Sequence, residues 1–224
     1  MRRFGPLGRH TRRWILKLLT RIDPPGSIAD LGCGDGELLI LLKRVYPGAE
    51  LLGCDFSRAA VEICRERLPG GRFFHHDLED PANPFGSILD VGICSEVLEH
   101  LADDLEALRN MTAFCRHLIL TLPGGHLDET ARRVGHLRHY SRASAEDLAR
   151  QAGLEVLYTR QWGFPLAYPF YRRVLNRSGY STLTGGYSLS KRLLCQVLYS
   201  LFWLNDLSPG GDKIFLLAQN PRLV

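Results

Sequence analysis

The sequence predicts one α/β domain of the doubly wound type, with helices covering both faces of a sheet. From residue 27 onward, short apolar segments alternate with segments of helical periodicity, and turns rich in glycine or proline separate them. Such alternation predicts parallel strands joined by right-handed crossovers. A length of 224 residues suits one domain, and 45% apolar residues suffice for a continuous core. No apolar run reaches the roughly 18 residues that cross a bilayer, so we expect no membrane span.

Strands and helices follow one another in a regular order. The run 88–94 is apolar without alternation, as expected for a strand covered on both faces. Ser57 has the side chain and position of a helix N-cap. We expect strands at 27–31, 50–54, 72–76, 88–94, 117–122, 154–161 and 213–219. We expect helices at 37–46, 57–68, 103–115 and 144–151.

The basic residues are concentrated at the start of the chain. Residues 1–21 carry seven basic residues and no acid, whereas the formal charge of the whole chain is +4, so the remainder carries −3. A nucleic-acid protein usually spreads basic charge over its body, so this distribution gives such a partner little support. Trp14, Ile15 and Leu18 recur at helical spacing, and we expect residues 1–24 to form a basic arm and a helix with one apolar face.

The six cysteines show no C-x-x-C spacing, and no secretory signal is visible. A free cysteine in or beside a strand behaves as a small core residue. We therefore expect thiols in a reducing, cytoplasmic compartment, with peripheral membrane association as a variant of that expectation.

A long connection separates the last two expected strands. About fifty residues lie there, far more than a hairpin needs, and 10 of the 21 aromatic residues fall within 162–203. We expect a core of residues 25–162 with 213–224, and a helical insertion over 163–212. The insertion has three open interpretations: a lid over an apolar acceptor, a homodimer surface, or a patch that contacts a membrane.

A glycine-rich turn follows the first expected strand. Residues 28–37 read Ile-Ala-Asp-Leu-Gly-Cys-Gly-Asp-Gly-Glu, with three glycines at alternate positions before a helix. Glycine is needed where the backbone turns sharply and touches a ligand. A dinucleotide fingerprint would need glycine where Glu37 stands, which disfavours NAD. Asp55 ends the second strand, where a carboxylate can accept both ribose hydroxyls, and Asp77 ends the third, where it can accept an adenine amine.

With these motifs in this order, residues 27–122 closely resemble class I S-adenosylmethionine-dependent methyltransferases, and the later strands extend the resemblance to about 25–220. The resemblance implies a seven-stranded, Rossmann-like methyltransferase sheet with an aromatic-rich insertion between its last two strands. It implies S-adenosylmethionine as cofactor and S-adenosylhomocysteine as product. The implied cofactor contacts are Asp30, Gly32, Gly34, Asp55, Phe56, Asp77, Leu78 and Ser95.

The fourth strand runs into Cys-Ser-Glu-Val-Leu-Glu-His-Leu over residues 94–101, which resembles the family segment that faces the acceptor. Methyl transfer is an in-line displacement that needs alignment, exclusion of water and, for a hydroxyl, removal of a proton. Histidine suits the proton transfer near neutral pH. The catalytic candidates are His136 first, then His100, with Glu96.

A metal-dependent mechanism is the alternative. Glu96, Glu99, His100 and His136 are similar in order and type to the metal-binding set of small-RNA 2′-O-methyltransferases, and also to ubiquinone-pathway O-methyltransferases. Such a set can hold Mg²⁺ or Mn²⁺ and lower the pKa of a bound hydroxyl. The same string occurs in related enzymes that use no metal, so the expectation is a site without one.

Three functions from different classes remain open. The leading hypothesis is methylation of a hydroxyl on a small or lipid-like acceptor, such as a natural product or a quinone-like compound, with a histidine as base. The first alternative is metal-assisted RNA 2′-O-methylation. The second is a scaffold that keeps the fold without catalysis. Nucleic acid is disfavoured as a partner, and 163–212 is the segment expected to contact a membrane or a second copy.

Overall fold

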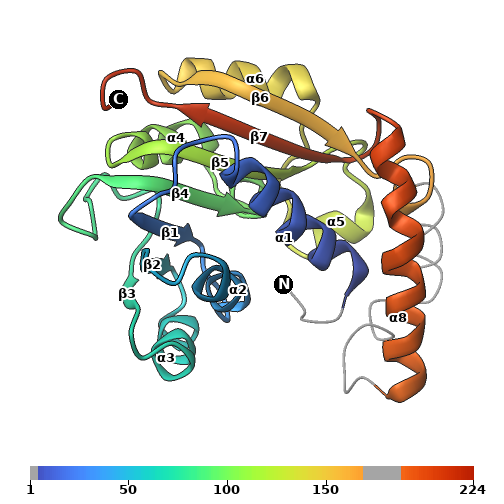
Figure 1. Ribbon diagram of the computed structural model, residues 1–224. Coiled ribbons are helices and arrows are strands. Elements are labelled where there is room, and N and C mark those ends of the chain that lie inside the picture. Colours follow the sequence, from blue (N-terminus) through green and yellow to red (C-terminus); the bar gives the residue numbers. More distant parts are fainter. Residues whose placement is uncertain (1–4, 169–187) are drawn as a thin grey trace.

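The computed structural model describes residues 5–168 and 188–224. Seven strands form one sheet in the order β3-β2-β1-β4-β5-β7-β6 (Figure 1). The strands are β1 (Ser27–Leu31), β2 (Glu50–Asp55), β3 (Arg72–His75), β4 (Leu89–Ser95), β5 (Cys115–Pro123), β6 (Glu155–Trp162) and β7 (Lys213–Gln219). The α-helices are α1 (Pro6–Leu19), α2 (Glu37–Val45), α3 (Arg58–Arg67), α4 (Asp104–Thr112), α5 (Glu129–Arg133), α6 (Arg142–Gln151) and α8 (Leu189–Leu201).

The predicted α/β class and the seven-stranded sheet are confirmed, and each predicted strand lies within two residues of an observed one. Ser57 caps α3 as expected, since its side chain accepts a hydrogen bond from the Ala60 N–H. Two short elements had no periodicity long enough to predict them. They are α5 and the 3₁₀ turn η1 (Leu98–His100).

Two predictions about the second half of the chain were wrong. Uniformly parallel pairing fails at β7, which runs antiparallel to both β5 and β6. The regular strand–helix alternation that predicts parallel pairing ends with β6, and the long connection between β6 and β7 brings the chain back the opposite way. The helix predicted over 103–115 ends at Thr112, and the next apolar residues, Phe114 and Cys115, are as buried as the helix residues before them. Periodicity therefore did not mark the boundary.

Helices cover both faces of the sheet with two apolar cores (Figure 1). On one face, α4 and α6 pack through residues such as Met111 and Ala145. On the other, α1, α2 and α3 pack through residues such as Leu39 and Val61. The predicted apolar face of the first helix is confirmed, since Trp14 and Ile15 are buried against this second face. Polar side chains of the central strands can therefore reach solvent only at the strand ends.

The connection after β6 is described in part. The aromatic residues predicted for it at positions 170, 171, 180 and 187 lie outside the described residues. Its described end consists of α8 and the 3₁₀ turn η4 (Phe202–Leu207), and α8 stands at the side of the molecule where β4 and β6 end (Figure 1). In the described part of the chain, no helix is both long and apolar enough to cross a bilayer. All six cysteines are buried free thiols.

Candidate functional site

The glycine-rich turn between β1 and α2 needs glycine for two separate reasons. Gly32 has a φ of +87°, and a Cβ there would lie 2.4 Å from a Val97 methyl group. Gly34 has a φ of +53°, and a Cβ there would meet no atom within 4 Å. Space excludes a side chain at Gly32, whereas backbone conformation selects glycine at Gly34. The turn therefore presents bare backbone at the carboxyl edge of the sheet.

Asp55 joins this turn to the start of α3. Its two carboxylate oxygens each accept one hydrogen bond of 2.8 Å, one from the Gly34 N–H and one from the Ser57 N–H. A carboxylate has about four lone-pair positions, so each oxygen keeps acceptor capacity. The side chain can thus hold the turn in place and still accept two hydroxyl groups from a ligand.

A cavity of about 490 Å³ opens beside these residues, within the range of small-molecule sites. It brings together five of the predicted cofactor residues with two of the predicted catalytic residues, Glu96 and His100. Those five cofactor residues are Gly32, Asp55, Phe56, Asp77 and Leu78. His76 also lines the cavity and was not predicted; burial lowers the pKa of its imidazole. Residues that follow β2 and β3 therefore face residues that follow β4 across one space.

Three predicted cofactor residues do not line the cavity. Gly34 is connected to the cavity only through the hydrogen bond that its backbone N–H donates to Asp55. Asp30 is buried in β1, and that burial raises the pKa of its carboxyl well above the usual range. The Ser95 hydroxyl is hydrogen-bonded to the Thr121 hydroxyl at 2.9 Å. Cofactor contacts from these three residues stay predictions.

Glu96 is held by two partners that the sequence did not reveal. It has a φ of +60°, which is uncommon for a residue with a side chain. One carboxylate oxygen accepts a 2.9 Å hydrogen bond from the Thr121 hydroxyl, and the other binds the Lys213 ammonium. Lys213 is buried at the start of β7. Burial alone would lower the lysine pKa, but the charge of the adjacent Glu96 raises it, so the ammonium stays charged.

Glu99 has the opposite environment, although it is only three residues away. It is fully buried, and neither carboxylate oxygen finds a hydrogen-bond partner in the described part of the chain. Burial, followed by the charge of Glu96, raises the pKa of Glu99 to about 8. Ligand atoms of Glu99, His100 and His136 lie within 4.8 Å of one another. This group has the donor types of a divalent-metal site. Glu96 lies outside it, because Lys213 and Thr121 bind its carboxylate.

Two histidines complete the cluster. The His100 Nδ1 lies 3.1 Å from the Gly135 carbonyl oxygen, which places the ring proton on Nδ1 and leaves Nε2 as an acceptor. The His136 Nδ1 lies 3.0 Å from the His139 Nε2, and the His136 ring meets the His100 ring edge-on, with centroids 4.8 Å apart. Burial, followed by the charges of His100 and His139, lowers the pKa of His136 to about 4. His136 is therefore neutral near pH 7.

The loop after α5 is fixed to η1 by backbone hydrogen bonds, which explains how residues 36 positions apart meet. The Leu137 N–H donates to the Glu99 carbonyl at 2.8 Å. The Arg138 guanidinium donates to the carbonyls of Leu101 and Ala102, each at 2.8 Å. These contacts set the position of His136 beside His100.

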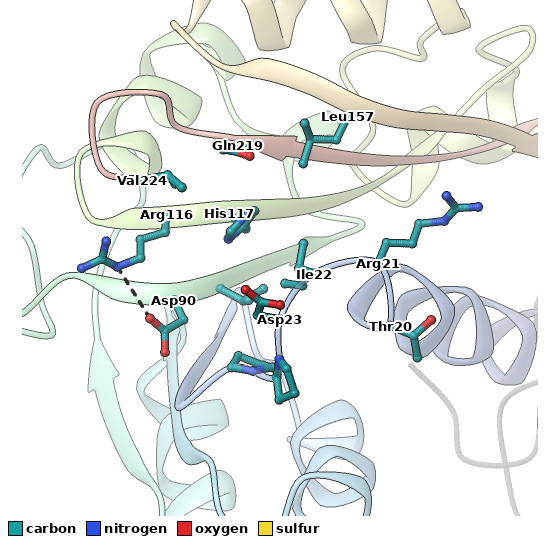
Figure 2. Close-up of a pocket in the computed structure, with 13 residues that line it drawn as sticks. Thr20, Arg21, Ile22, Asp23, Asp90, Arg116, His117, Leu157, Gln219 and Val224 are labelled. Atoms are coloured by element: carbon teal, nitrogen blue, oxygen red, sulfur yellow. Dashed lines mark ion pairs between the residues drawn. The ribbon is translucent and has the colours of Figure 1, made fainter.

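A second cavity, of about 660 Å³, lies at the opposite edge of the sheet (Figure 2). Asp90 and Arg116, at the starts of β4 and β5, face each other there at 3.6 Å. The Asp90 carboxylate also accepts hydrogen bonds from the backbone N–H groups of Gly26 and Ser27. None of the predicted site residues lines this cavity.

Comparison with known proteins agrees with this geometry. A family model described as "Methyltransferase domain" matches residues 1–159. A trans-aconitate 2-methyltransferase of Rhodopseudomonas palustris is 33% identical over 90 residues, which cover 40% of this chain and 34% of that protein. The chain thus spans about a third of the length of the curated relatives it matches.

Two solved structures show the same fold at low identity. The N-methyltransferase NodS from Bradyrhizobium japonicum, in complex with S-adenosylhomocysteine, has a TM-score of 0.61 and 16% identity, covering 97% of this chain and 89% of NodS. The geranyl diphosphate C-methyltransferase from Streptomyces coelicolor has a TM-score of 0.64 and 13% identity, covering 96% of this chain and 81% of that one. Nitrogen and carbon methyltransferases therefore share this fold, so the fold does not identify the acceptor.

Replacing Lys213 with methionine should destabilise the protein by about 3 kcal/mol, because a partly buried Glu96 carboxylate would lose its counterion. The double variant Glu96→Gln/Lys213→Met should recover most of this loss, since it removes both charges. Urea denaturation measures both effects. Arg133→Met is the control, because its pair with Glu129 is exposed and should change stability by less than about 1 kcal/mol. A double variant as unstable as the single one would contradict the pairing.

Proposed function

The chain belongs to the methyltransferase-domain family of S-adenosylmethionine-dependent enzymes, and we propose that it transfers the methyl group of this cofactor to an oxygen atom of a small acceptor. One observation carries the proposal. A single cavity is lined by the carboxylates that follow β2 and β3 and, across from them, by His100 of the Glu99–His100–His136 cluster. Cofactor-binding and proton-accepting groups thus share one space.

The residues present fit an adenosyl ligand. Asp55 keeps acceptor capacity on both oxygens, which suits the two ribose hydroxyls. Asp77 is the acceptor for the adenine amine, beside the apolar side chains of Leu78 and Phe56. Phe56 is 73% exposed, so a flat base stacked on its ring would cover apolar surface that solvent now reaches. The bare backbone of Gly32 lies against the methionine portion.

The cofactor supplies a methyl carbon bonded to a positive sulfur, and the protein aligns the acceptor and removes its proton. His136 is neutral at pH 7, which is the form that accepts a proton. A pKa of about 4 makes this imidazole a weak base, so it matches hydroxyls that are already acidic, such as phenols and quinols. We therefore assign a hydroxyl of this kind as acceptor and His136 as the group that takes its proton. His136 does not itself line the cavity; its ring meets the edge of His100, which does.

The names of the curated relatives point to another oxygen acceptor. Trans-aconitate is a carboxylic acid, and a carboxylate is a nucleophile without any proton removal. Such an acceptor would leave the histidines without a role as bases. The two acceptors give different products, an ether from a hydroxyl and an ester from a carboxylate.

A metal-assisted mechanism is the second candidate, and Glu99 favours it. A fully buried carboxylate without hydrogen bonds is costly as an anion, and a bound cation would remove that cost. His100 has the arrangement of a metal-binding imidazole, with Nδ1 on a backbone carbonyl and Nε2 free to coordinate. A metal held by Glu99, His100 and His136 would lower the pKa of a bound hydroxyl, including a 2′-hydroxyl of RNA. RNA as acceptor would show binding that weakens steeply with salt.

The first prediction concerns the cofactor. Asp55→Ala should weaken binding of S-adenosylhomocysteine by about 2–3 kcal/mol, because two charge-assisted hydrogen bonds are lost. Isothermal titration calorimetry measures it, and Asp147→Ala on the exposed face of α6 is the control. An Asp55→Ala affinity equal to wild type would contradict the ribose assignment. If the wild-type protein does not bind the ligand, the non-catalytic scaffold becomes the better interpretation.

The second prediction concerns the acceptor. Wild-type protein given methyl-labelled cofactor should label catechol, a hydroxyl acceptor, more than trans-aconitate, and the product should survive mild alkali. His136→Gln should lower kcat by about 10²-fold or more and leave S-adenosylhomocysteine affinity unchanged, because it removes a proton acceptor. Label that is released by alkali as methanol would identify an ester and a carboxylate acceptor instead.

The third prediction separates the two mechanisms. If a metal binds the cluster, calorimetry with Mn²⁺ alone should detect binding that Glu99→Gln weakens at least about tenfold, since the variant loses its anionic ligand. His126→Gln, in an exposed loop, is the control. No Mn²⁺ binding by wild-type protein, together with turnover unchanged by EDTA, would exclude the metal-assisted mechanism.

A further inference from the structure

Helix α8 is anchored to α1 by polar contacts along one side. The Arg9 guanidinium donates to the Gln196 side chain at 2.9 Å and lies over the Tyr199 ring. The Arg13 guanidinium binds both carboxylate oxygens of Asp206, just after α8, at 2.7 and 2.8 Å. His10 approaches the Tyr199 carbonyl at 2.9 Å. These contacts fix which face of α8 points toward α1 and the sheet.

A neighbouring face of α8 is apolar and exposed. Leu189, Leu193, Val197 and Leu201 are spaced four residues apart, which places them on one side of a helix. Their exposed fractions are 83%, 67%, 49% and 46%. Exposed apolar residues continue into η4 at Trp203, Leu204 and Leu207. We call the row from Leu189 to Leu207 the α8 face. A continuous apolar row of this length is unusual on a surface exposed to water.

The helices around the α8 face are strongly basic. α8 carries Lys191 and Arg192 and no acid, and α1 carries no acid either. A groove of about 650 Å³ runs between α1 and α2, and Tyr199 of α8 lines it as well. Five arginines and one carboxylate, Glu37, line this groove. The arginines are Arg9, Arg12, Arg13, Arg44 and Arg67. The α8 face and the arginine-lined groove are therefore close to each other, because α8 contributes residues to both.

We propose that α8 and α1 dock this protein on an anionic phospholipid bilayer. The apolar side chains of the α8 face enter the boundary between headgroups and acyl chains, and Arg9 and Arg44 of the groove lie against lipid phosphates. An apolar helix face flanked by basic residues is the pattern of interfacial helices. Each basic residue near an anionic membrane surface contributes about 1 kcal/mol. The docking does not depend on the methyl transfer proposed above.

A second copy of the chain fits this surface less well. A two-fold dimer places the same patch of both copies face to face. The arginines of α1 and the basic residues of α8 would then approach their own counterparts, and like charges across an interface are unfavourable. A bilayer that contains anionic lipid offers charge of the opposite sign and an apolar interior together. Charge complementarity therefore selects the membrane over the dimer.

Sedimentation with lipid vesicles tests the proposal, using wild-type protein and no cofactor. Vesicles of phosphatidylcholine and phosphatidylglycerol in equal parts should bind the protein, and vesicles of phosphatidylcholine alone should bind it much less. Leu193→Glu/Val197→Glu should reduce the partition coefficient on the order of a hundredfold, because it places two charges in the apolar boundary. Arg44→Gln should reduce it about fivefold.

Ile63→Glu is the matched control, since it places a charge at an exposed apolar position on α3, away from the α8 face. It should bind vesicles like wild type, and all variants should bind S-adenosylhomocysteine like wild type, which shows that they are folded. Wild-type protein that ignores anionic vesicles would overturn the proposal. So would light scattering that shows a wild-type dimer converted to monomer by the α8 substitutions without vesicle binding, because a second copy would then cover the face.

Discussion

Burial of the central strands on both faces is the constraint on which the site depends. β1, β4 and β5 are covered by helices on either side, so an ionisable side chain inside them has no solvent and few partners. Chemistry is therefore confined to the carboxyl edge of the sheet, where successive strands deliver their next residues to the same place. Asp55, Asp77 and Glu96 meet there for this reason, although each follows a different strand.

The proposed cofactor residues that line one cavity could be named from the sequence because each of the features that mark them is local. A glycine turn, a carboxylate after a strand and a capping serine are each set by a few neighbouring residues, and their order along the chain gives their order along the sheet edge. The cavity that joins Asp55, Asp77 and Leu78 agrees with that order. The sequence pattern did not show that the Gly34 N–H donates a hydrogen bond to Asp55. Asp55, the residue proposed to bind the ribose, therefore also holds the glycine-rich turn in place.

The acceptor half was not predictable, because its partners come from distant segments. In the sequence, Lys213 is only the first residue of an expected strand. It lies beside Glu96 because β7 runs antiparallel to β5. His10 and Arg12 belong to the expected basic arm and first helix, and nothing in the sequence indicated that both would be buried where α1 packs. Contacts between residues far apart in the chain leave no periodic pattern in the sequence. The spacing of Glu96, Glu99 and His100 gave the residue types correctly but could not show that one glutamate already has a cation.

This difference between the two glutamates determines what the site can do. The Lys213 ammonium binds the Glu96 carboxylate, and the charge of Glu96 raises the pKa of its neighbour Glu99. Glu99 has no such partner, and it can stay buried only as the neutral acid or against an added cation. Without a metal, Glu99, with a pKa of about 8, and His136, with a pKa of about 4, are both neutral near pH 7, which suits an acceptor that loses its proton readily. A metal held by Glu99, His100 and His136 would favour the ionised form of Glu99 and would lower the pKa of a bound hydroxyl. Under the metal-assisted proposal, the metal content of the site would therefore determine which hydroxyls it could use.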